Sequence, residues 1–199
     1  MSLRHALLGF LTTEPTSGYR LAQEFSESAG WFWYASHSQI HPELRRLEEA
    51  GLVTSEVGAG DARGTRTYRI TDAGRAELDR WLKDGATEYP PVRDVERIRL
   101  LFLDQQPLEV IRKHFEAHID HHRRLLQIYS DQLDANQRGV FPRLVKRLAV
   151  AAPGTEDIVQ GLKEIALKGQ VMRAETEITW AENALRWLAG HDAAGRVQS

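Results

Sequence analysis

Within the first 85 residues the hydrophobic period changes from helical to extended and back, and this change constrains the fold more than any other feature. Apolar residues recur three or four positions apart in three short segments, which predicts helices that end before Pro15, near Gly30 and at Gly51. Residues 52–71 then alternate like two strands around a glycine-rich tip. Thr71 can cap a fourth helix. The sequence therefore predicts a mainly α unit with one small β-hairpin.

The apolar spacing also indicates which side of each element is buried. Ile40, Leu44 and Leu47 define the buried stripe of the third helix, and Tyr68 and Ile70 share one face of the second strand. The predicted stripe of the fourth helix comprises Gly74, Leu78, Trp81 and Leu82, with Gly74 allowing a close backbone approach. Pro42 belongs in or near the first turn of the third helix, and if Ser38 is the cap we expect an irregular first turn.

Three short helices followed by a hairpin are the order of a winged helix-turn-helix, and the charge pattern fits DNA binding. Residues 62–70 contain three arginines (Arg63, Arg66 and Arg69) and no acid, which suits a minor groove or a phosphate ridge. Opposite the apolar stripe of the third helix lie residues that a major groove could admit. These are Ser38, His41, Pro42 and Arg45, with Gln39 as a candidate partner of adenine. The alternative is that Arg45 and Arg46 merely pair with Glu48 and Glu49 along a solvated helix.

The segments SGYRLAQEF, SQIHPELRRLEEAGLV and RTYRITDAGRAELDRWL resemble the PadR family of bacterial transcriptional regulators in order and spacing. The resemblance implies a homodimeric repressor with helix 38–50 in the major groove and the wing 60–66 on flanking backbone. The matching DNA-binding positions are Ser38, Gln39, His41, Pro42, Arg45, Arg63, Thr65 and Arg66. Tyr19 and Tyr68 also match family positions, and we expect both to support the core or backbone, with a phosphate contact as the alternative for Tyr19. His41 departs from the tyrosine that often precedes the proline, so its charge depends on pH.

The second half reads as a helical domain joined to the first by a stiff connection. Pro90 and Pro91 favour an extended linker over residues 86–94, between a DNA-binding domain at 1–85 and a helical domain at 95–199. A short helix carries Val95, Ile98, Leu101 and Phe102, and Pro107 is suited to the first position of a long one. A short helix near 144–150 follows, and residues 153–155 start the last long helix.

That last helix is apolar over more of its circumference than one packing partner requires. One stripe comprises Ile158, Leu162, Ile165, Met172, Trp180, Ala184 and Trp187, and a second comprises Val171, Ile178 and Leu185. An exposed patch of that size marks an interface. We therefore predict a two-fold dimer made mostly by this helix and the joint region. The resemblance covers this half as well, since many PadR relatives carry a helical dimerisation domain of this size.

Two further groups of residues could bind a ligand. His114, His118 and His122 follow one another at i, i+4, i+8, with Glu116 and Asp120 nearby, and such histidines can bind zinc or nickel. A metal-responsive regulator is therefore one alternative, and a run of amphipathic residues at the edge of the dimer interface is the other. Trp31 and Trp33 are candidates for holding a planar small-molecule effector, with ordinary packing as the alternative.

The composition excludes several classes of protein. The chain has no cysteine, which excludes disulfides, thiolate metal sites and cysteine nucleophiles. It has no apolar run near ~18 residues, and we expect a cytoplasmic protein without membrane contact. We find no nucleophile–base pair, phosphate loop or cofactor fingerprint, so we predict neither an enzyme nor a cofactor. Residues 1–85 hold 10 basic and 12 acidic side chains, so a winged-helix interaction module that binds no DNA remains an alternative.

Overall fold

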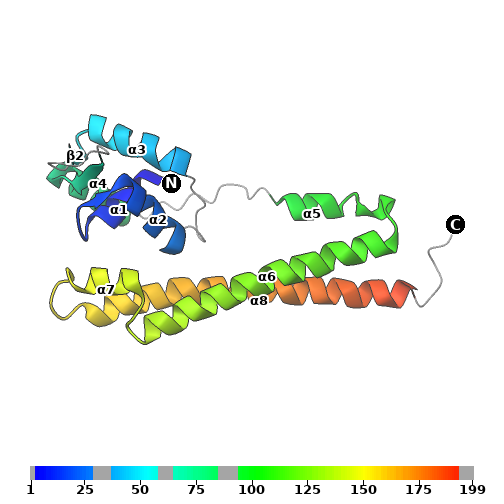
Figure 1. Cartoon of the computed structure of the whole chain (residues 1–199). Coiled ribbons are helices and arrows are strands. Elements are labelled where there is room, and N and C mark those ends of the chain that lie inside the picture. Colours follow the sequence, from blue (N-terminus) through cyan, green and yellow to red (C-terminus); the bar gives the residue numbers. More distant parts are fainter. Residues whose placement is uncertain (1–2, 29–36, 58–64, 85–93, 193–199) are drawn as a thin grey trace. The chain divides into compact units, whose positions relative to one another are not determined.

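The computed structural model describes residues 3–28, 37–57, 65–84 and 94–192. The chain divides into two compact units, Met1–Glu88 and Tyr89–Ser199 (Figure 1). Residues 85–93, which include most of the predicted linker, lie outside the described residues, so the predicted limits of the linker stay a prediction.

The first unit contains four helices and a small sheet among its described residues. Its elements are α1 (Leu3–Leu11), β1 (Thr16–Ser17), α2 (Gly18–Ser28), α3 (His37–Glu49), β2 (Val53–Val57), β3 (Arg66–Ile70) and α4 (Asp72–Lys83). The predicted mainly α unit with a hairpin is confirmed. The two-residue strand β1 was not predicted: it pairs antiparallel with β3 and makes the strand order β1-β3-β2.

The core of this unit lies between the three N-terminal helices and the sheet. Ile40, Leu44 and Leu47 of α3 are fully buried, and Tyr68 and Ile70 of β3 are buried beside them, as predicted. Two expectations were wrong. Leu82 is 67% exposed because α4 extends beyond the core that Gly74 and Leu78 contact. Tyr19 is also 67% exposed, because it lies on the side of α2 opposite Leu21, Ala22 and Phe25.

Two glycines are needed where α3 ends and α4 begins. Gly51 has φ of 70° and closes α3, its N–H bonding to the Glu48 carbonyl while the Leu52 N–H bonds to the Leu47 carbonyl. A Cβ on Gly74 would lie 2.1 Å from the Leu52 carbonyl oxygen, so the predicted close approach is confirmed. Thr71 caps α4 by accepting the Gly74 N–H, and α4 is thereby fixed to the base of the hairpin.

Pro42 is the sixth residue of α3, deeper than the first turn where the sequence placed it. The helix runs through it as α-helix, so the expected irregular first turn is not found in the described part of α3. Because Pro42 lies on the exposed side, the carbonyl that loses a helical partner is not enclosed by the core.

The second unit is a long antiparallel helix pair with shorter helices at its ends. Its elements are α5 (Val95–Leu100), a 3₁₀ turn (Leu103–Gln105), α6 (Leu108–Gln137), α7 (Pro142–Leu148) and α8 (Glu156–Asp192). Figure 1 shows α6 and α8 side by side along most of their length. Pro107 is the residue that caps α6 and not, as expected, its first helical residue. None of the described helices combines the length and apolarity that crossing a membrane requires.

The buried side of α8 differs from the stripes read from the sequence. Leu167, Ala174, Ala181 and Leu188, each seven residues apart, are the buried hydrophobic residues of this helix. Ile178, Trp180, Ala184 and Leu185 pack partly buried against the core around Phe115 and Ile119. The remaining apolar residues of the predicted first stripe are 63–67% exposed: Ile158, Leu162, Ile165, Met172 and Trp187. The apolar residues of α5 and its end are also exposed, namely Val95, Ile98, Leu101 and Phe102.

Candidate nucleic-acid interface

The exposed side of α3 carries all five helix residues that the sequence singled out. Ser38, Gln39, His41, Pro42 and Arg45 are exposed, whereas the apolar stripe faces the core. The stripe holds α3 by three fully buried side chains, so the orientation of its outer face is set by core packing. A rigid helix with a polar outer face is what entry into a major groove requires.

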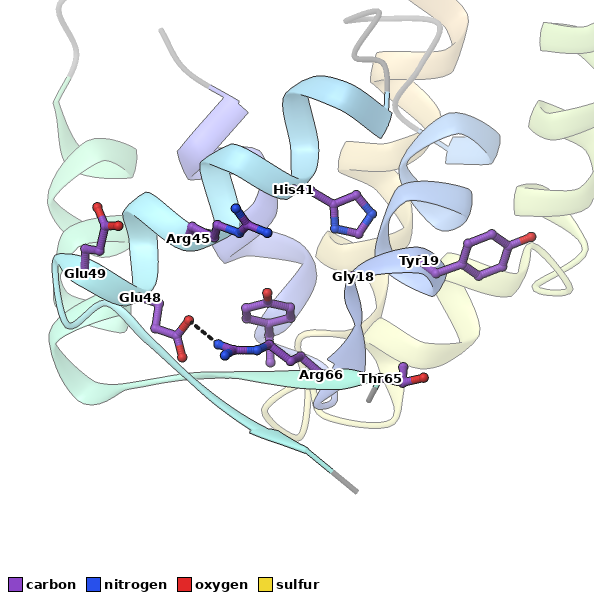
Figure 2. A pocket seen from close by; sticks show the side chains of 9 residues that line it. Gly18, Tyr19, His41, Arg45, Glu48, Glu49, Thr65 and Arg66 are labelled. Carbon is purple, nitrogen blue, oxygen red and sulfur yellow. Dashed lines mark hydrogen bonds and ion pairs between the residues drawn. The ribbon is translucent and has the colours of Figure 1, made fainter. Parts of the chain in front are cut away.

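A pocket of about 600 Å³ joins this face to the hairpin (Figure 2). His41 and Arg45 of α3 line it together with Thr65 and Arg66 of the wing, so four of the predicted site residues meet here. Its other lining residues are Gly18, Tyr19, Glu48, Glu49 and Tyr68. Ser38, Gln39 and Pro42 lie on the same helix outside the pocket lining, and Arg63 lies outside the described residues.

The start of α2 closes one side of this pocket. A Cβ on Gly18 would lie 2.9 Å from Cε1 of His41, so glycine lets the imidazole pack directly against the α2 backbone. The Ser17 hydroxyl accepts the Arg20 N–H at 3.2 Å and stabilises that first turn. Tyr19 follows on the exposed side, and its ring borders the pocket. Tyr19 was predicted mainly to support the core or backbone, although its helical position relative to Leu21 already places it off the apolar stripe.

A polar network connects the third helix to the wing. Arg66 Nη1 lies 3.2 Å from Glu48 Oε2, and the Ser55 hydroxyl donates to Glu48 Oε1 at 2.6 Å. Arg66 Nη1 also donates to Ser55 Oγ at 3.3 Å. The Arg66 side chain remains 55% exposed, so this pair is a surface contact that orients the guanidinium without enclosing it.

The alternative prediction, in which Arg45 and Arg46 pair with Glu48 and Glu49 along α3, is wrong. Arg46 pairs with Glu43 at 3.1 Å, and Glu48 pairs with Arg66 of the wing. Arg45 makes no ion pair with any residue that the structure describes. It lies close enough to Tyr68 to act on that phenol: burial raises the pKa of Tyr68, Glu48 adds to the rise, and Arg66 and Arg45 oppose it. Arg45 is therefore a cation whose charge is available to an anion at the pocket.

Two of the three candidate metal-ligating histidines of α6 lie together, and the third lies apart from them. His118 and His122 have ring centroids 4.4 Å apart, whereas His114 lies beside Glu96 of α5 at 3.4 Å. Glu116 and Asp120, the carboxylates expected nearby, are exposed on the other side of α6. Glu177 of α8 takes their place, with Oε2 3.2 Å from His118 Nε2. It lies 59 residues from His118 in the sequence, so helical spacing gave no signal for it.

Trp31 and Trp33 lie outside the described residues. Among the described tryptophans, Trp81 stacks on His5 with ring centroids 4.9 Å apart, and Trp180 contacts Phe115 edge-to-face at 5.6 Å. These two rings pack within their own units.

The helix order, the three-stranded sheet and the outward polar face of α3 define a winged helix-turn-helix protein with a helical second unit. Two family models match the chain: "Transcriptional regulator PadR-like family" over residues 7–80 and "Virulence activator alpha C-term" over residues 92–189. The chain belongs to the PadR-like family of transcriptional regulators. This membership confirms the predicted fold and family, and the family is one of regulators and not of enzymes.

Two relatives show how far the sequence similarity extends. The chain is 39% identical over 94 residues to the probable transcriptional regulator Rv1176c of Mycobacterium tuberculosis, covering 47% of this chain and 50% of the relative. It is 41% identical over 81 residues to the negative transcriptional regulator PadR of Bacillus subtilis, which covers 40% of this chain and 44% of the relative. The matches thus span about half the length of these relatives.

Similarity of structure extends over nearly the whole chain. The virulence activator AphA of Vibrio cholerae is 30% identical, with a TM-score of 0.67 over 96% of this chain and 99% of that one. Bacillus subtilis PadR in complex with operator DNA has a TM-score of 0.68 at 24% identity, over 94% of this chain and 98% of that one. The structure of the same protein with p-coumaric acid has a TM-score of 0.63 at 25% identity, again over 94% of this chain and 98% of that one.

Proposed function

We propose that this protein is a homodimeric DNA-binding repressor. Its α3 helices would recognise an inverted repeat in the major groove, and its wings would contact the flanking DNA backbone. The observation that carries the proposal is the pocket of Figure 2, where His41 and Arg45 of the helix and Thr65 and Arg66 of the wing face one exposed surface. Helix and wing therefore present their polar groups to the same ligand. Arg45 and Arg66 share this surface with Glu48 and Glu49, and Glu48 pairs with Arg66, so Arg45 is the cation here without a described ion-pair partner.

The two arginines of this surface suit different parts of the duplex. Arg45 is one turn along α3 from His41 and has no described counter-ion, so it can reach a guanine edge or a phosphate. Arg66 is held by Glu48 beside the helix and suits the backbone, where position matters more than base identity. Gln39 projects from the exposed start of α3 and is assigned to adenine. Arg63 would extend the same cationic wing.

Dimerisation is supported by the apolar residues that the second unit leaves exposed. The stripe of α8 at Ile158, Leu162, Ile165 and Met172 runs along one side of the helix away from the α6 core. Val95, Ile98 and Phe102 add a second exposed apolar group at α5. A second copy of the chain would cover these residues, and a two-fold dimer would offer one α3 helix to each half of an inverted repeat.

Repression and effector release complete the proposal. Bacillus subtilis PadR is a negative transcriptional regulator, and its structure has been solved with operator DNA and with p-coumaric acid. In some dimer conformations the two α3 helices would be wrongly spaced for the operator. A small molecule that stabilises such a conformation would release DNA, because it lowers the population of the DNA-binding conformation. Trp31 and Trp33 remain the candidates for the effector contact.

Binding to DNA is tested by fluorescence anisotropy with duplexes selected from a random pool. Arg66→Ala is expected to weaken binding to all sequences alike, and Gln39→Ala to relax the preference at one base position. Arg80→Ala is the matched control, because Arg80 is an exposed arginine of α4 paired with Glu77 and does not line the pocket. If Arg66→Ala and Arg80→Ala behave alike, the wing assignment is wrong.

The dimer is tested by sedimentation of a variant with a charge in the α8 stripe. Ile165→Glu should sediment as a monomer with unchanged helix content, because Ile165 is 67% exposed in the single chain and its replacement disturbs no core. Glu175→Lys, a charge change at an exposed polar position of the same helix, should leave the dimer intact. A monomeric wild-type protein would overturn the dimer.

A further inference from the structure

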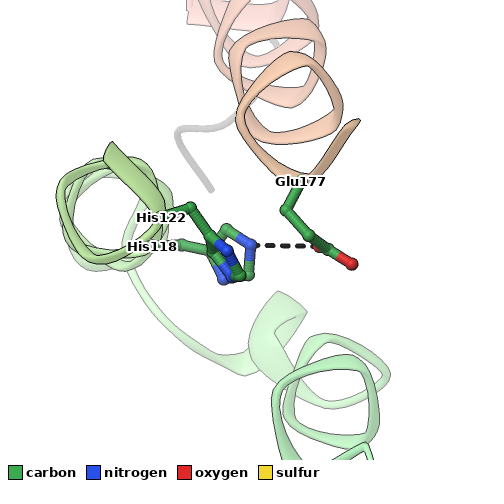
Figure 3. A group of neighbouring side chains, drawn as sticks. All are labelled: His118, His122 and Glu177. Carbon is green, nitrogen blue, oxygen red and sulfur yellow. Dashed lines mark hydrogen bonds and ion pairs between the residues drawn. The ribbon is translucent and has the colours of Figure 1, made fainter. Parts of the chain in front are cut away.

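Three potential metal ligands from two helices meet in the second unit. His118 and His122 project from α6 towards Glu177 of α8 (Figure 3). One ligand atom from each of the three lies within 4.8 Å of the other two. The two histidines are one helical turn apart, a spacing at which their rings reach the same point in space. The cluster lies within a single compact unit.

His118 and Glu177 are largely shielded from water, and one nitrogen of His122 has no hydrogen-bond partner among the described residues. The His118 side chain is 9% exposed and that of Glu177 18%, so water competes weakly for the site. His122 Nδ1 is buried and has no hydrogen-bond partner among the described residues.

Arg97 of α5 holds the carboxylate in place. Its Nη2 donates to both oxygens of Glu177 at 3.0 Å, and its guanidinium lies 4.7 Å from the centroid of Trp180. Glu177 Oε2 faces His118, so one oxygen is oriented towards the histidines while the guanidinium fixes the group from outside. Such outer partners orient ligands in known metal sites.

We propose that His118, His122 and Glu177 bind a divalent transition-metal ion of the zinc type. Two imidazoles and one carboxylate are the donors of three-ligand zinc sites, in which a fourth position is left to water or another ligand. Calcium and magnesium are disfavoured, because they require mainly oxygen ligands and the cluster offers one carboxylate. His114 is not a ligand in this site, since it faces Glu96. The site does not depend on the proposed DNA binding.

The test measures zinc binding to the untagged full-length chain, stripped with a chelator and titrated with Zn²⁺ against a chromophoric competitor. Wild type should bind one ion per chain. His118→Ala, His122→Ala and Glu177→Gln should each weaken binding by more than the ~10–100-fold that loss of an outer partner costs. His121→Ala and His114→Ala are the matched controls on the same helix and should bind like wild type.

A second readout separates loss of a ligand from loss of fold. Zn²⁺ should raise the melting temperature of wild type and His121→Ala and leave that of His122→Ala unchanged, with helix content by circular dichroism equal in all three. Spectra of the Co²⁺-loaded chain should show four-coordinate geometry. Absence of binding to wild type, equal binding by all variants, or loss in His114→Ala with retention in Glu177→Gln would each overturn the proposal.

Discussion

Replacing Gly74 with alanine tests the contact that joins α4 to the hairpin. In an exposed helix the exchange stabilises by about 1 kcal/mol, because alanine is the better helix former. At Gly74 the new Cβ would lie 2.1 Å from the Leu52 carbonyl oxygen and 2.9 Å from Ile70 Cγ1. No side-chain rotation relieves the first contact, because both groups belong to the backbone or are fixed to it. The start of α4 must therefore move by about 1 Å, given that non-bonded heavy atoms sit near 3.5 Å.

That movement breaks specific bonds. The Thr71 N–H bonds to the Leu52 carbonyl at 3.1 Å, and the Thr71 hydroxyl donates to the Gly51 carbonyl at 2.8 Å. Two weakened hydrogen bonds at about 1 kcal/mol each, with overpacking of about 1–3 kcal/mol, outweigh the gain in helix propensity. We expect Gly74→Ala to lower the free energy of unfolding of the first unit by about 2–4 kcal/mol.

The assay is urea unfolding of the full chain followed by circular dichroism. Gly9→Ala is the control, because Gly9 is also helical and an added Cβ there meets nothing within 4 Å. Gly9→Ala should be neutral or stabilising by up to about 1 kcal/mol. If Gly74→Ala is as stable as Gly9→Ala, the close approach of α4 to Leu52 is wrong.

Three further outcomes follow from single contacts. Glu48→Gln should tighten DNA binding about threefold in fluorescence anisotropy, because it removes a screened negative charge beside Arg66. Weaker binding would show that the Glu48–Arg66 pair chiefly positions the wing. Burial, then Arg143 and Arg147, lowers the pKa of Lys163 to about 8. The unfolded chain keeps that proton to about pH 10.4, so stability should rise with pH from about 8 to 10.4, and Lys163→Met should stabilise by about 1–3 kcal/mol at pH 7 and abolish the rise. An unchanged pH profile in Lys163→Met urea melts would refute this. Asn136→Ala should destabilise the packing of α6 against α8 by about 1–2 kcal/mol in thermal melts, because the fully buried Asn136 amide donates to the Gln160 carbonyl at 3.3 Å. An unchanged melting temperature would show that this hydrogen bond contributes little.

The elements of the first unit could be predicted because their signals are local. Capping by Thr71, the stop at Gly51 and the alternation of Tyr68 and Ile70 each depend on residues close in sequence. The strand β1 could not be predicted in this way, because two residues show no periodicity and their pairing with Tyr68 and Thr67 is a tertiary contact.

The second unit shows where sequence patterns lose information. A helix that is apolar around most of its circumference does not reveal which stripe its own partner covers. The buried row of α8 includes Ala174 and Ala181, whose small side chains contribute little to a hydrophobic pattern but allow close approach to α6. The larger Ile158, Leu162 and Ile165 remain exposed. Glu177 was missed for the same reason as β1, since only the pairing of α6 with α8 brings it to His118.

Whether the protein is a dimeric reader of a symmetric operator is decided by selecting bound duplexes from a random DNA pool. We expect an inverted repeat whose half-sites lie about one helical turn, ~10 bp, apart, bound by two chains. Recovery of no enriched sequence, or of a single half-site without symmetry, would contradict it.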